Sequence, residues 1–243
     1  MPSLPAQAKL ANHELRGLLG VNTLRPRRVG EILKKSARQL LRKIYGGRAD
    51  AHLDLYGLSN QHRRKHGRGC DMFPSDPLQA PLWAAFASLT HARRILEVGC
   101  GHGYTAAVMA SAAGPDCRVD TIEEDHDHAN LAEQSFEQRG LSARIHVLRG
   151  RGQNVLSRLK GQYDIVFLDG DWREYPGYIP HLRRLTHPGS IVVTANLNPL
   201  FGGWGGRLPG KPAIQSYLTR LVMDPHFRTY VIPGEWHSIS VRV

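Results

Sequence analysis

The stretch RILEVGCGHGYT, at Arg94–Thr105, decides the fold of this chain. Its first part is an apolar run interrupted only by Glu97, which is typical of a short buried strand. Glycines then recur at every second position, as Gly99, Gly101 and Gly103, and they let the backbone turn tightly and approach a ligand before a helix begins. The stretch therefore predicts a strand, a glycine turn and a helix, with a ligand site at the end of the strand.

A second apolar strand ends in acid within VDTIEED, at Val119–Asp125. Glu123 lies about 20 residues after the glycines, where a carboxylate accepts hydrogen bonds from both ribose hydroxyls of an adenosine-bearing cofactor. Charge-assisted hydrogen bonds of this kind contribute roughly 1.5 to 3 kcal/mol each. Together the two stretches predict a pocket for such a cofactor.

The spacing of the glycines favours S-adenosylmethionine over a dinucleotide. A dinucleotide site is marked by GxGxxG, whereas this chain has GxGxG with Tyr104 where the third glycine would fall. Glu97 inside the strand and the acidic run Glu123, Glu124 and Asp125 suit a cationic sulfonium better than phosphates. Two alternatives stay open: a nicotinamide or flavin cofactor, and glycines that only close a turn.

The composition indicates one intracellular domain. The chain has 243 residues, enough for one α/β domain with a modest extension. Its three cysteines, Cys70, Cys100 and Cys117, are an odd number without CxxC spacing, which indicates neither a disulfide framework nor a zinc site. No segment approaches the ~20 apolar residues of a membrane span, and the N-terminus lacks the apolar core of a secretion signal. We therefore expect a cytoplasmic protein.

The positive charge is concentrated at the N-terminus. The first 70 residues contain 15 Lys and Arg against 4 Asp and Glu, whereas residues 71–243 contain 17 of each class. We expect residues 1–75 to form a basic, partly helical arm, because Val29–Tyr45 has the pattern of a basic amphipathic helix. Three roles stay open for this helix: docking on its own domain or on a second subunit of a homo-oligomer, contact with an anionic membrane surface, and binding of nucleic acid or another polyanion.

A second basic run, QHRRKHGR at Gln61–Arg68, is bounded by glycine and is predicted to be a solvated loop. His62 and His66 have the spacing of metal ligands on a helix. The neighbouring sequence supplies no third ligand, so a metal site is the less favoured interpretation.

From Pro77 onward, strand-like and helix-like segments alternate, which predicts a Rossmann-like, doubly wound, mainly parallel α/β sheet with an antiparallel hairpin at its C-terminal edge. The expected helices are 78–90, 104–113, 126–139, 152–160, 174–185 and 212–223. The expected strands are 94–98, 117–122, 143–148, 163–168, 190–195, 226–232 and 237–243. Ligands of such sheets lie outside the carboxyl ends of the strands. This rule gathers Gly99, Glu123, Gly152, Asp169 and Asn196 around one crevice.

Several motifs occur in the order and spacing of a known family. They are LEVG at Leu96–Gly99, GYT at Gly103–Thr105, TIEED at Thr121–Asp125, GRGQ at Gly150–Gln153, YDIVFLDGDWREY at Tyr163–Tyr175, PGS at Pro188–Ser190 and TAN at Thr194–Asn196. On these motifs residues 76–243 resemble a class I S-adenosylmethionine-dependent methyltransferase of the catechol and caffeoyl-CoA O-methyltransferase type.

The resemblance implies a role for each matched position. Gly99, Gly101 and Thr105 would hold the methionine end of the cofactor, and Glu123 would bind the ribose. Gly152 and Gln153 would flank the adenine, with Asp169 beside the sulfonium. The full predicted cofactor set is Glu97, Gly99, Gly101, Thr105, Glu123, Glu124, Gly152, Gln153 and Asp169.

The chain departs from this family at the metal site and at the catalytic lysine. The family holds a divalent cation with two aspartates and an asparagine; Asp169 and Asn196 match two of these ligands, but Ala195 stands at the third. Trp172 stands at the lysine position. Magnesium prefers near-octahedral oxygen ligation, so we expect no obligatory metal, with Mg²⁺ held by a reoriented Asp171 as the alternative.

Without the lysine, the acceptor hydroxyl needs another general base, and the candidates are Asp169, Asp171 and His237. Histidine has the best matched pKa, although His237 could also be a surface residue of the terminal hairpin. Trp172, Trp204 and Trp236 would line an aromatic or sugar-like acceptor pocket, with ordinary packing as the alternative.

The sequence thus predicts an enzyme that transfers a methyl group to a small-molecule hydroxyl. An aminopropyl transferase of the spermidine synthase type is disfavoured, because Trp172 and Arg173 stand where a second acidic site would follow the fourth strand. A nucleic-acid methyltransferase, or a binding module that uses the basic arm, is the other alternative. The absence of an NPPY-like motif in 194–199 disfavours a methyltransferase that acts on exocyclic amines of nucleic acid, and binding with a steep salt dependence would be needed to favour this alternative.

Overall fold

The computed structural model describes residues 47–67, 70, 72–77, 79–197, 211–232 and 237–243. The chain divides into two compact units, Met1–Ala51 and His52–Val243, and nearly all of the described residues belong to the second unit. The predicted amphipathic helix of the arm, Trp204 and Trp236 lie outside the described residues.

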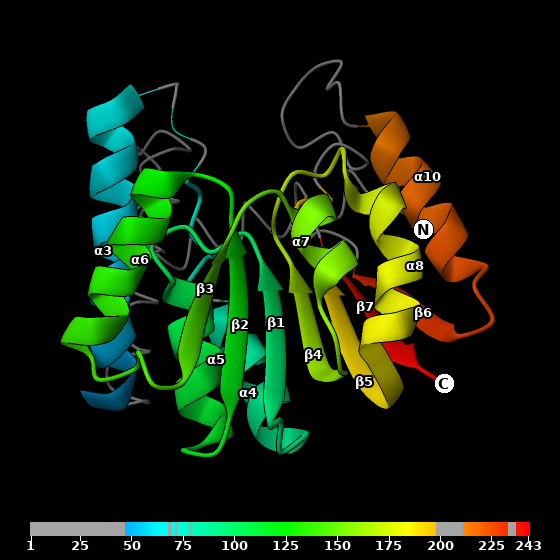
Figure 1. Ribbon diagram of the computed structural model, residues 1–243, viewed down its shortest axis with the longest axis horizontal. Helices are drawn as coiled ribbons and strands as arrows, with labels where there is room; N and C mark the ends of the chain where they lie inside the picture. The colour runs from blue at the N-terminus through cyan, green and yellow to red at the C-terminus, as the bar shows by residue number, and fades with distance from the viewer. Residues whose placement is uncertain (1–46, 68–69, 71, 78, 198–210, 233–236) are drawn as a thin grey trace, which may run out of the picture. The chain divides into compact units, whose positions relative to one another are not determined.

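A seven-stranded sheet forms the centre of the second unit (Figure 1). Its strands are β1 Arg94–Val98, β2 Arg118–Glu123, β3 Ile145–Arg149, β4 Tyr163–Leu168, β5 Thr186–Thr194, β6 Phe227–Ile232 and β7 His237–Arg242. They lie in the order β3-β2-β1-β4-β5-β7-β6, with β1 to β5 parallel and β7 antiparallel to both β5 and β6. The predicted doubly wound parallel sheet with an antiparallel edge hairpin is therefore confirmed.

Helices cover both faces of the sheet. They are α3 Gly47–His66, α4 Ala80–Leu89, α5 Tyr104–Ala113, α6 His126–Gln138, α7 Gly152–Arg158, α8 Tyr175–Leu185 and α10 Lys211–Val222. Buried side chains of α4, α5 and α6 pack in one apolar cluster, and those of α7, α8 and α10 pack in a second cluster on the opposite face. In Figure 1 the second group stands in front of the sheet, with α4 and α5 behind it. No helix among the described residues is long and apolar enough to cross a bilayer.

The register of the parallel strands brings the predicted site residues to one edge of the sheet. Val98 pairs with Ile122 on one side and with Leu168 on the other, and Leu168 pairs with Thr194. The residues that follow these strand ends therefore meet at the carboxyl edge. The chain runs from β1 outward to β3 and then crosses back to β4, so the switch point of the topology, where such sheets bind ligands, lies between β1 and β4.

The predicted loop over Gln61–Arg68 was wrong for most of its length, because α3 continues to His66. Leu55 and Ser59 are buried at a spacing of four residues, and His62 follows on the same face. The apolar anchor thus lies before the basic run, and the charged residues occupy the outer face of a helix. The helix ends where Gly67 takes a positive φ of 64°.

The remaining element boundaries agree with the expectation to within a few residues, apart from the start of β5. This strand begins at Thr186 rather than at 190, and it pairs with Tyr163 before the register shifts. Pro188 and Gly189 indicated a loop by sequence, yet Ser190 bonds the carbonyl of Tyr163 through its hydroxyl at 2.8 Å and keeps the segment on the sheet.

Candidate cofactor site

The glycine turn after β1 is a tightly packed left-handed segment. Gly99, Gly101 and Gly103 have φ values of 97°, 53° and 81°, a region that favours glycine. A Cβ at Gly99 would lie 2.5 Å from the backbone oxygen of Asp169, and one at Gly103 would overlap the ring of Phe136. The turn therefore packs so closely against the residue after β4 and against Phe136 that side chains at Gly99 and Gly103 would not fit.

Glu123 closes this turn from the end of β2. Its Oε2 accepts a hydrogen bond of 2.8 Å from the N–H of Gly101, and its Oε1 accepts one of 3.0 Å from the N–H of Asp125. The residue is 8% exposed, so the carboxylate lies at the boundary between core and solvent. Each oxygen keeps a second lone pair that can accept a hydrogen bond from a ligand hydroxyl.

The other two members of the acidic run have different surroundings. Asp125 caps α6 and accepts hydrogen bonds of 2.9 Å from the N–H groups of Asp127 and His128, which hold the pKa of its carboxyl below the usual range. Glu124 has a largely exposed side chain, with one carboxylate oxygen 3.8 Å from Arg151. Glu123 is thus the member of the run that bonds the glycine turn.

Glu97 carries an unpaired oxygen in the core. The residue is fully buried; its Oε2 accepts a hydrogen bond of 2.5 Å from Thr121, while its Oε1 has no hydrogen-bond partner among the described residues. Burial raises the pKa of this carboxyl to about 8 against the opposing bond from Thr121, and the charges of Asp169 and Glu123 raise it further. A buried oxygen without a partner is costly, so this position is suited to a polar ligand group.

The remaining predicted cofactor residues lie around the same edge. Thr105, in the first turn of α5, is buried and donates its hydroxyl to Ser75 at 3.0 Å. Gly152 begins α7 where a Cβ would collide with the hydroxyl of Tyr178. The side chain of Gln153 is directed at α8, because its Nε2 lies 3.2 Å from Nε2 of His181.

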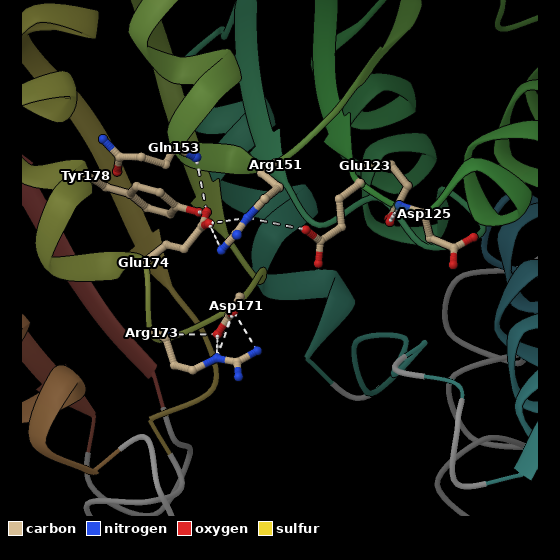
Figure 2. A network of polar contacts seen from close by, with 9 residues as sticks. Glu123, Asp125, Arg151, Gln153, Asp171, Arg173, Glu174 and Tyr178 are labelled. Carbon is tan, nitrogen blue, oxygen red and sulfur yellow. Dashed lines mark hydrogen bonds and ion pairs between the residues drawn. The ribbon is translucent and has the colours of Figure 1, made fainter.

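Glu174 is a residue that the sequence reasoning missed. Its Oε2 accepts hydrogen bonds from the N–H of Gln153 at 3.1 Å and from the Tyr178 hydroxyl at 2.8 Å, and its Oε1 accepts one from Arg151 at 2.8 Å (Figure 2). One carboxylate thus joins the β3–α7 turn to α8. Its place directly before the motif residue Tyr175 gives no sequence signal for this role.

An open hollow of about 450 Å³ adjoins this network. It is lined entirely by charged side chains, which are Glu124, Arg151, Asp171, Arg173 and Glu174. Its lining residues follow the carboxyl ends of β2, β3 and β4 along the chain.

Asp169 and Asn196 meet as the motifs predict. The Asn196 amide donates to Oδ1 of Asp169 at 2.6 Å, and Asn196 has a φ of 62°. Burial raises the pKa of Asp169 to about 7, although the Asn196 bond opposes the shift. Ala195 offers a single backbone oxygen, which the Tyr175 hydroxyl approaches at 3.4 Å. One carboxyl bonded to one amide does not fit a magnesium site.

The other candidate bases have less suitable surroundings. Burial pushes the pKa of Asp171 up, but its hydrogen bonds with Arg173, 2.8 Å from the side-chain Nε, outweigh burial and leave the pKa lowered. His237 is 7% exposed, and its ring centroid lies 5.0 Å from that of Trp83, so the interpretation as a surface residue was wrong. Since Ser238 pairs with Thr194, His237 begins β7 at the carboxyl end of β5.

One part of the Trp172 side chain packs against the apolar core. It is partly buried against the apolar cluster beneath α8, and its Nε1 is buried without a hydrogen-bond partner in the described part of the chain. Its role in an acceptor pocket stays a prediction, and the other two tryptophans of that prediction are outside the described residues.

The fold and the site define a Rossmann-like α/β protein with a ligand site at the topological switch point. A family model described as O-methyltransferase matches residues 68–208. The chain therefore belongs to the O-methyltransferase family.

Individual relatives agree with this assignment. A catechol O-methyltransferase of Niastella koreensis is 31% identical over 125 residues, which are 50% of this chain and 57% of that protein. One of Mycobacterium tuberculosis is 32% identical over 120 residues, 49% of this chain and 54% of that protein. The chain thus spans about half the length of the curated relatives it matches. The O-methyltransferase of Bacillus cereus, solved in complex with SAH, shares the fold, with a TM-score of 0.72 at 18% identity over 86% of this chain and 97% of that chain.

Proposed function

We propose that this protein is an S-adenosylmethionine-dependent O-methyltransferase that acts on a small-molecule acceptor. The observation that carries the proposal is the pair of carboxylates around the glycine turn. Glu123 offers lone pairs at the boundary of the core that can accept hydrogen bonds from a ribose, and Glu97 has a buried oxygen without a partner among the described residues, which can accept one from a methionine ammonium. The bound SAH in the related Bacillus cereus structure supports the same ligand class.

When bound, S-adenosylmethionine supplies an electrophilic methyl group at a sulfonium. The residues of this chain would bind and orient its parts: Glu123 the ribose, Glu97 the amino group, and the Gly152 turn the adenine. Gln153 would contact the base only after its side chain leaves His181. Glu174 would position that turn through the N–H of Gln153.

The acceptor hydroxyl has to lose a proton, and Asp169 is the best supported base. A pKa of about 7 leaves its carboxyl partly ionised near neutrality, where general base catalysis contributes about 10² to 10⁴ in rate. Asn196 binds Oδ1 and leaves Oδ2 for the hydroxyl. His237 is the second candidate, and Asp171 is disfavoured because Arg173 lowers its pKa. The proposed reaction has no metal-dependent step, because the donor set at Asp169 does not fit a metal ion.

Calorimetric titration with S-adenosylmethionine and with SAH tests the cofactor site. We expect micromolar affinity for the wild-type protein and a loss of at least about tenfold for Glu123→Ala, since one lost charged hydrogen bond is worth roughly 1.5 to 3 kcal/mol. Gly101→Arg should abolish binding. Glu133→Ala is the matched control, because Glu133 is an exposed acid paired with Arg149. Equal affinities for Glu123→Ala and the control would refute the site.

An activity screen against phenolic, sugar and amine acceptors tests the reaction class. Methyl transfer to a hydroxyl is expected, and it should fall about 100-fold or more in Asp169→Asn. Transfer to amines alone, with none to hydroxyls, would refute the assignment to oxygen.

We propose in addition that the protein is a cytoplasmic homo-oligomer whose basic arm contacts a second subunit. The first 70 positions contain 15 basic and 4 acidic residues, and this excess of positive charge supports a dedicated contact for the segment. Light scattering of the full chain measures the oligomeric state. Binding to DNA or to anionic vesicles with a steep salt dependence, by a monomeric protein, would favour the polyanion role instead.

A further inference from the structure

Three side chains from separate parts of the sequence bring metal-ligand atoms together beside α6. A ring nitrogen of His62, the sulfur of Cys70 and a ring nitrogen of His128 all lie within 4.8 Å of one another. Cys70 Sγ is 3.7 Å from Nε2 of His128, and the His62 and His128 rings meet edge to face with centroids 5.4 Å apart. We propose that His62, Cys70 and His128 bind a zinc ion.

The chemical types of the three ligand atoms favour zinc over other metal ions. One thiolate and two imidazoles are borderline-soft ligands that suit Zn²⁺, whereas Mg²⁺ and Ca²⁺ prefer oxygen. With Zn–S near 2.3 Å and Zn–N near 2.0 to 2.1 Å, ligand atoms of a tetrahedral site lie roughly 3.3 to 3.6 Å apart. The contact of 3.7 Å between Cys70 and His128 is close to that spacing. His62, in the last turns of α3, has to approach by about 1 Å, a shift within the reach of its side-chain rotation.

The surroundings of His128 complete the arrangement of a zinc ligand. Its Nε2 faces Cys70, while its Nδ1 lies 4.0 Å from Oε1 of Glu123. At this distance the carboxylate is too far away for a hydrogen bond to the ring, although it lies on the side where such a partner orients a ligating histidine. The Asp125 side chain also caps the N–H of His128 and fixes its place in the first turn of α6.

Two of the three proposed ligands are shielded from solvent. Cys70 is 7% exposed, and the side chain of His128 is 12% exposed. Two more rings surround His62: His66 stacks on it at 4.1 Å, and His102 meets it edge to face at 5.5 Å. Three protein ligands leave the fourth tetrahedral position to water.

This site differs in place and in chemistry from the Asp169 and Asn196 pair. It lies at the end of β2 and joins α3, the segment after α3, and α6. A zinc ion there would fasten α3 to the helix that follows Glu123, so the cofactor carboxylate would have the metal site directly behind it. The inference does not depend on the proposed methyltransferase activity.

Cobalt substitution tests the proposal without any methyl donor or acceptor. Tag-free, full-length protein is treated with a chelator, reduced and titrated with Co²⁺ while its absorption spectrum is recorded. The wild-type protein should bind one ion with tetrahedral d–d bands and a thiolate-to-cobalt charge-transfer band. Cys70→Ser should lose that band, and His62→Gln and His128→Gln should bind at least about tenfold more weakly. Cys117→Ser and His146→Gln are matched controls, with a buried cysteine and an exposed histidine outside the cluster.

Thermal unfolding of the same proteins gives a second measurement, and the unfolding transition of each metal-free variant shows whether that variant is folded. Zn²⁺ should raise the Tm of the wild-type protein and of both controls, because a ligand that binds the folded state stabilises it by mass action. Cys70→Ser should show no such rise. A wild-type protein without a charge-transfer band, or with metal binding that Cys70→Ser leaves unchanged, would overturn the proposal. Mass spectrometry of the purified chain measures the zinc content directly.

Discussion

The N–H of Gly101 donates a hydrogen bond of 2.8 Å to Oε2 of Glu123 and thereby joins the turn after β1 to the end of β2. The donor is a backbone group in a left-handed conformation, and the acceptor is a charged side chain 22 positions later. The bond orients Glu123 before any ligand arrives. Such preorganisation lowers the cost of ordering the site on binding.

The packing of the glycine turn predicts a large stability difference between two alanine variants. Gly99 and Gly114 both have a φ of 97°, but a Cβ at Gly99 would meet the Asp169 carbonyl at 2.5 Å, whereas no atom of the described residues lies within 4 Å of one at Gly114. Gly114→Ala should cost about 1 to 3 kcal/mol of backbone strain. Gly99→Ala should cost about 1 to 3 kcal/mol more through overpacking.

Urea denaturation of both glycine variants measures the difference in the free energy of unfolding. Because Gly114 has the same φ as Gly99, comparing the two variants separates the strain of a positive φ from the collision with Asp169. Equal losses in the two variants would contradict the close approach of β1 and β4 at this turn.

The raised pKa of Glu97 leads us to predict that the free energy of unfolding falls as the pH rises. Its pKa is about 8 in the folded protein against 4.5 as the ordinary value, so the folded state binds more protons than the unfolded state between these pH values. Stability therefore decreases with pH across this window and levels off above pH 8. Since one pKa unit corresponds to about 1.4 kcal/mol, the loss attributable to Glu97 is at most about 5 kcal/mol.

Chemical denaturation over this pH range, for the wild-type protein and for Glu97→Gln, measures the effect. Glutamine keeps the bond from Thr121 and removes the charge, so the slope should become shallower. It should not vanish, because the raised pKa of Asp169 acts with the same sign. A slope unchanged by Glu97→Gln would show that this carboxyl titrates normally.

Glu174 should contribute more to stability than its ion pair with Arg151 alone would provide. Its side chain is 10% exposed and accepts from Gln153 and Tyr178, whereas the partner Arg151 has a side chain that is 60% exposed. Glu174→Gln should lower the free energy of unfolding by about 1 to 3 kcal/mol. Arg151→Gln should have a clearly smaller effect than Glu174→Gln, because an ion pair with an exposed arginine is worth little. Thermal and urea unfolding measure both variants, and equal losses of stability from the two substitutions would contradict this ranking.

The pair of Asp169 and Asn196 should not hold a hard divalent cation. Mn²⁺ can be followed by its paramagnetic resonance, and its spectrum should stay that of the free ion at about millimolar concentration, because a single carboxyl and an amide give too few oxygen ligands. Tight Mn²⁺ binding that disappears in Asp169→Asn would show that Asp171 or backbone oxygens complete a metal site.

The local pattern of this sequence was sufficient for most of the fold. Apolar runs such as Ile95 to Val98, bounded by glycine, are strands because their side chains are buried on both faces of a parallel sheet. The basic run after Gln61 was misjudged, because the apolar residues that hold α3 in place precede it. β5 begins earlier than Pro188 and Gly189 indicated, because the Ser190 side chain replaces part of the strand pairing.

The sequence by itself determined the fold class and the residues at the carboxyl edge of the sheet, since these follow from periodicity and from the rules of parallel topology, whereas the order of the strands came from the structure. Tertiary structure alone decided what each acidic group contacts: Glu97 keeps an oxygen that is unpaired within the described part of the chain, Asp125 caps a helix, and Glu174 joins two elements. It also brought Cys70 to His62 and His128. The physical reason is that hydrogen bonds and ligand sets form between residues that are close in space, and the distance between His128 and Cys70 along the chain carries no local signal.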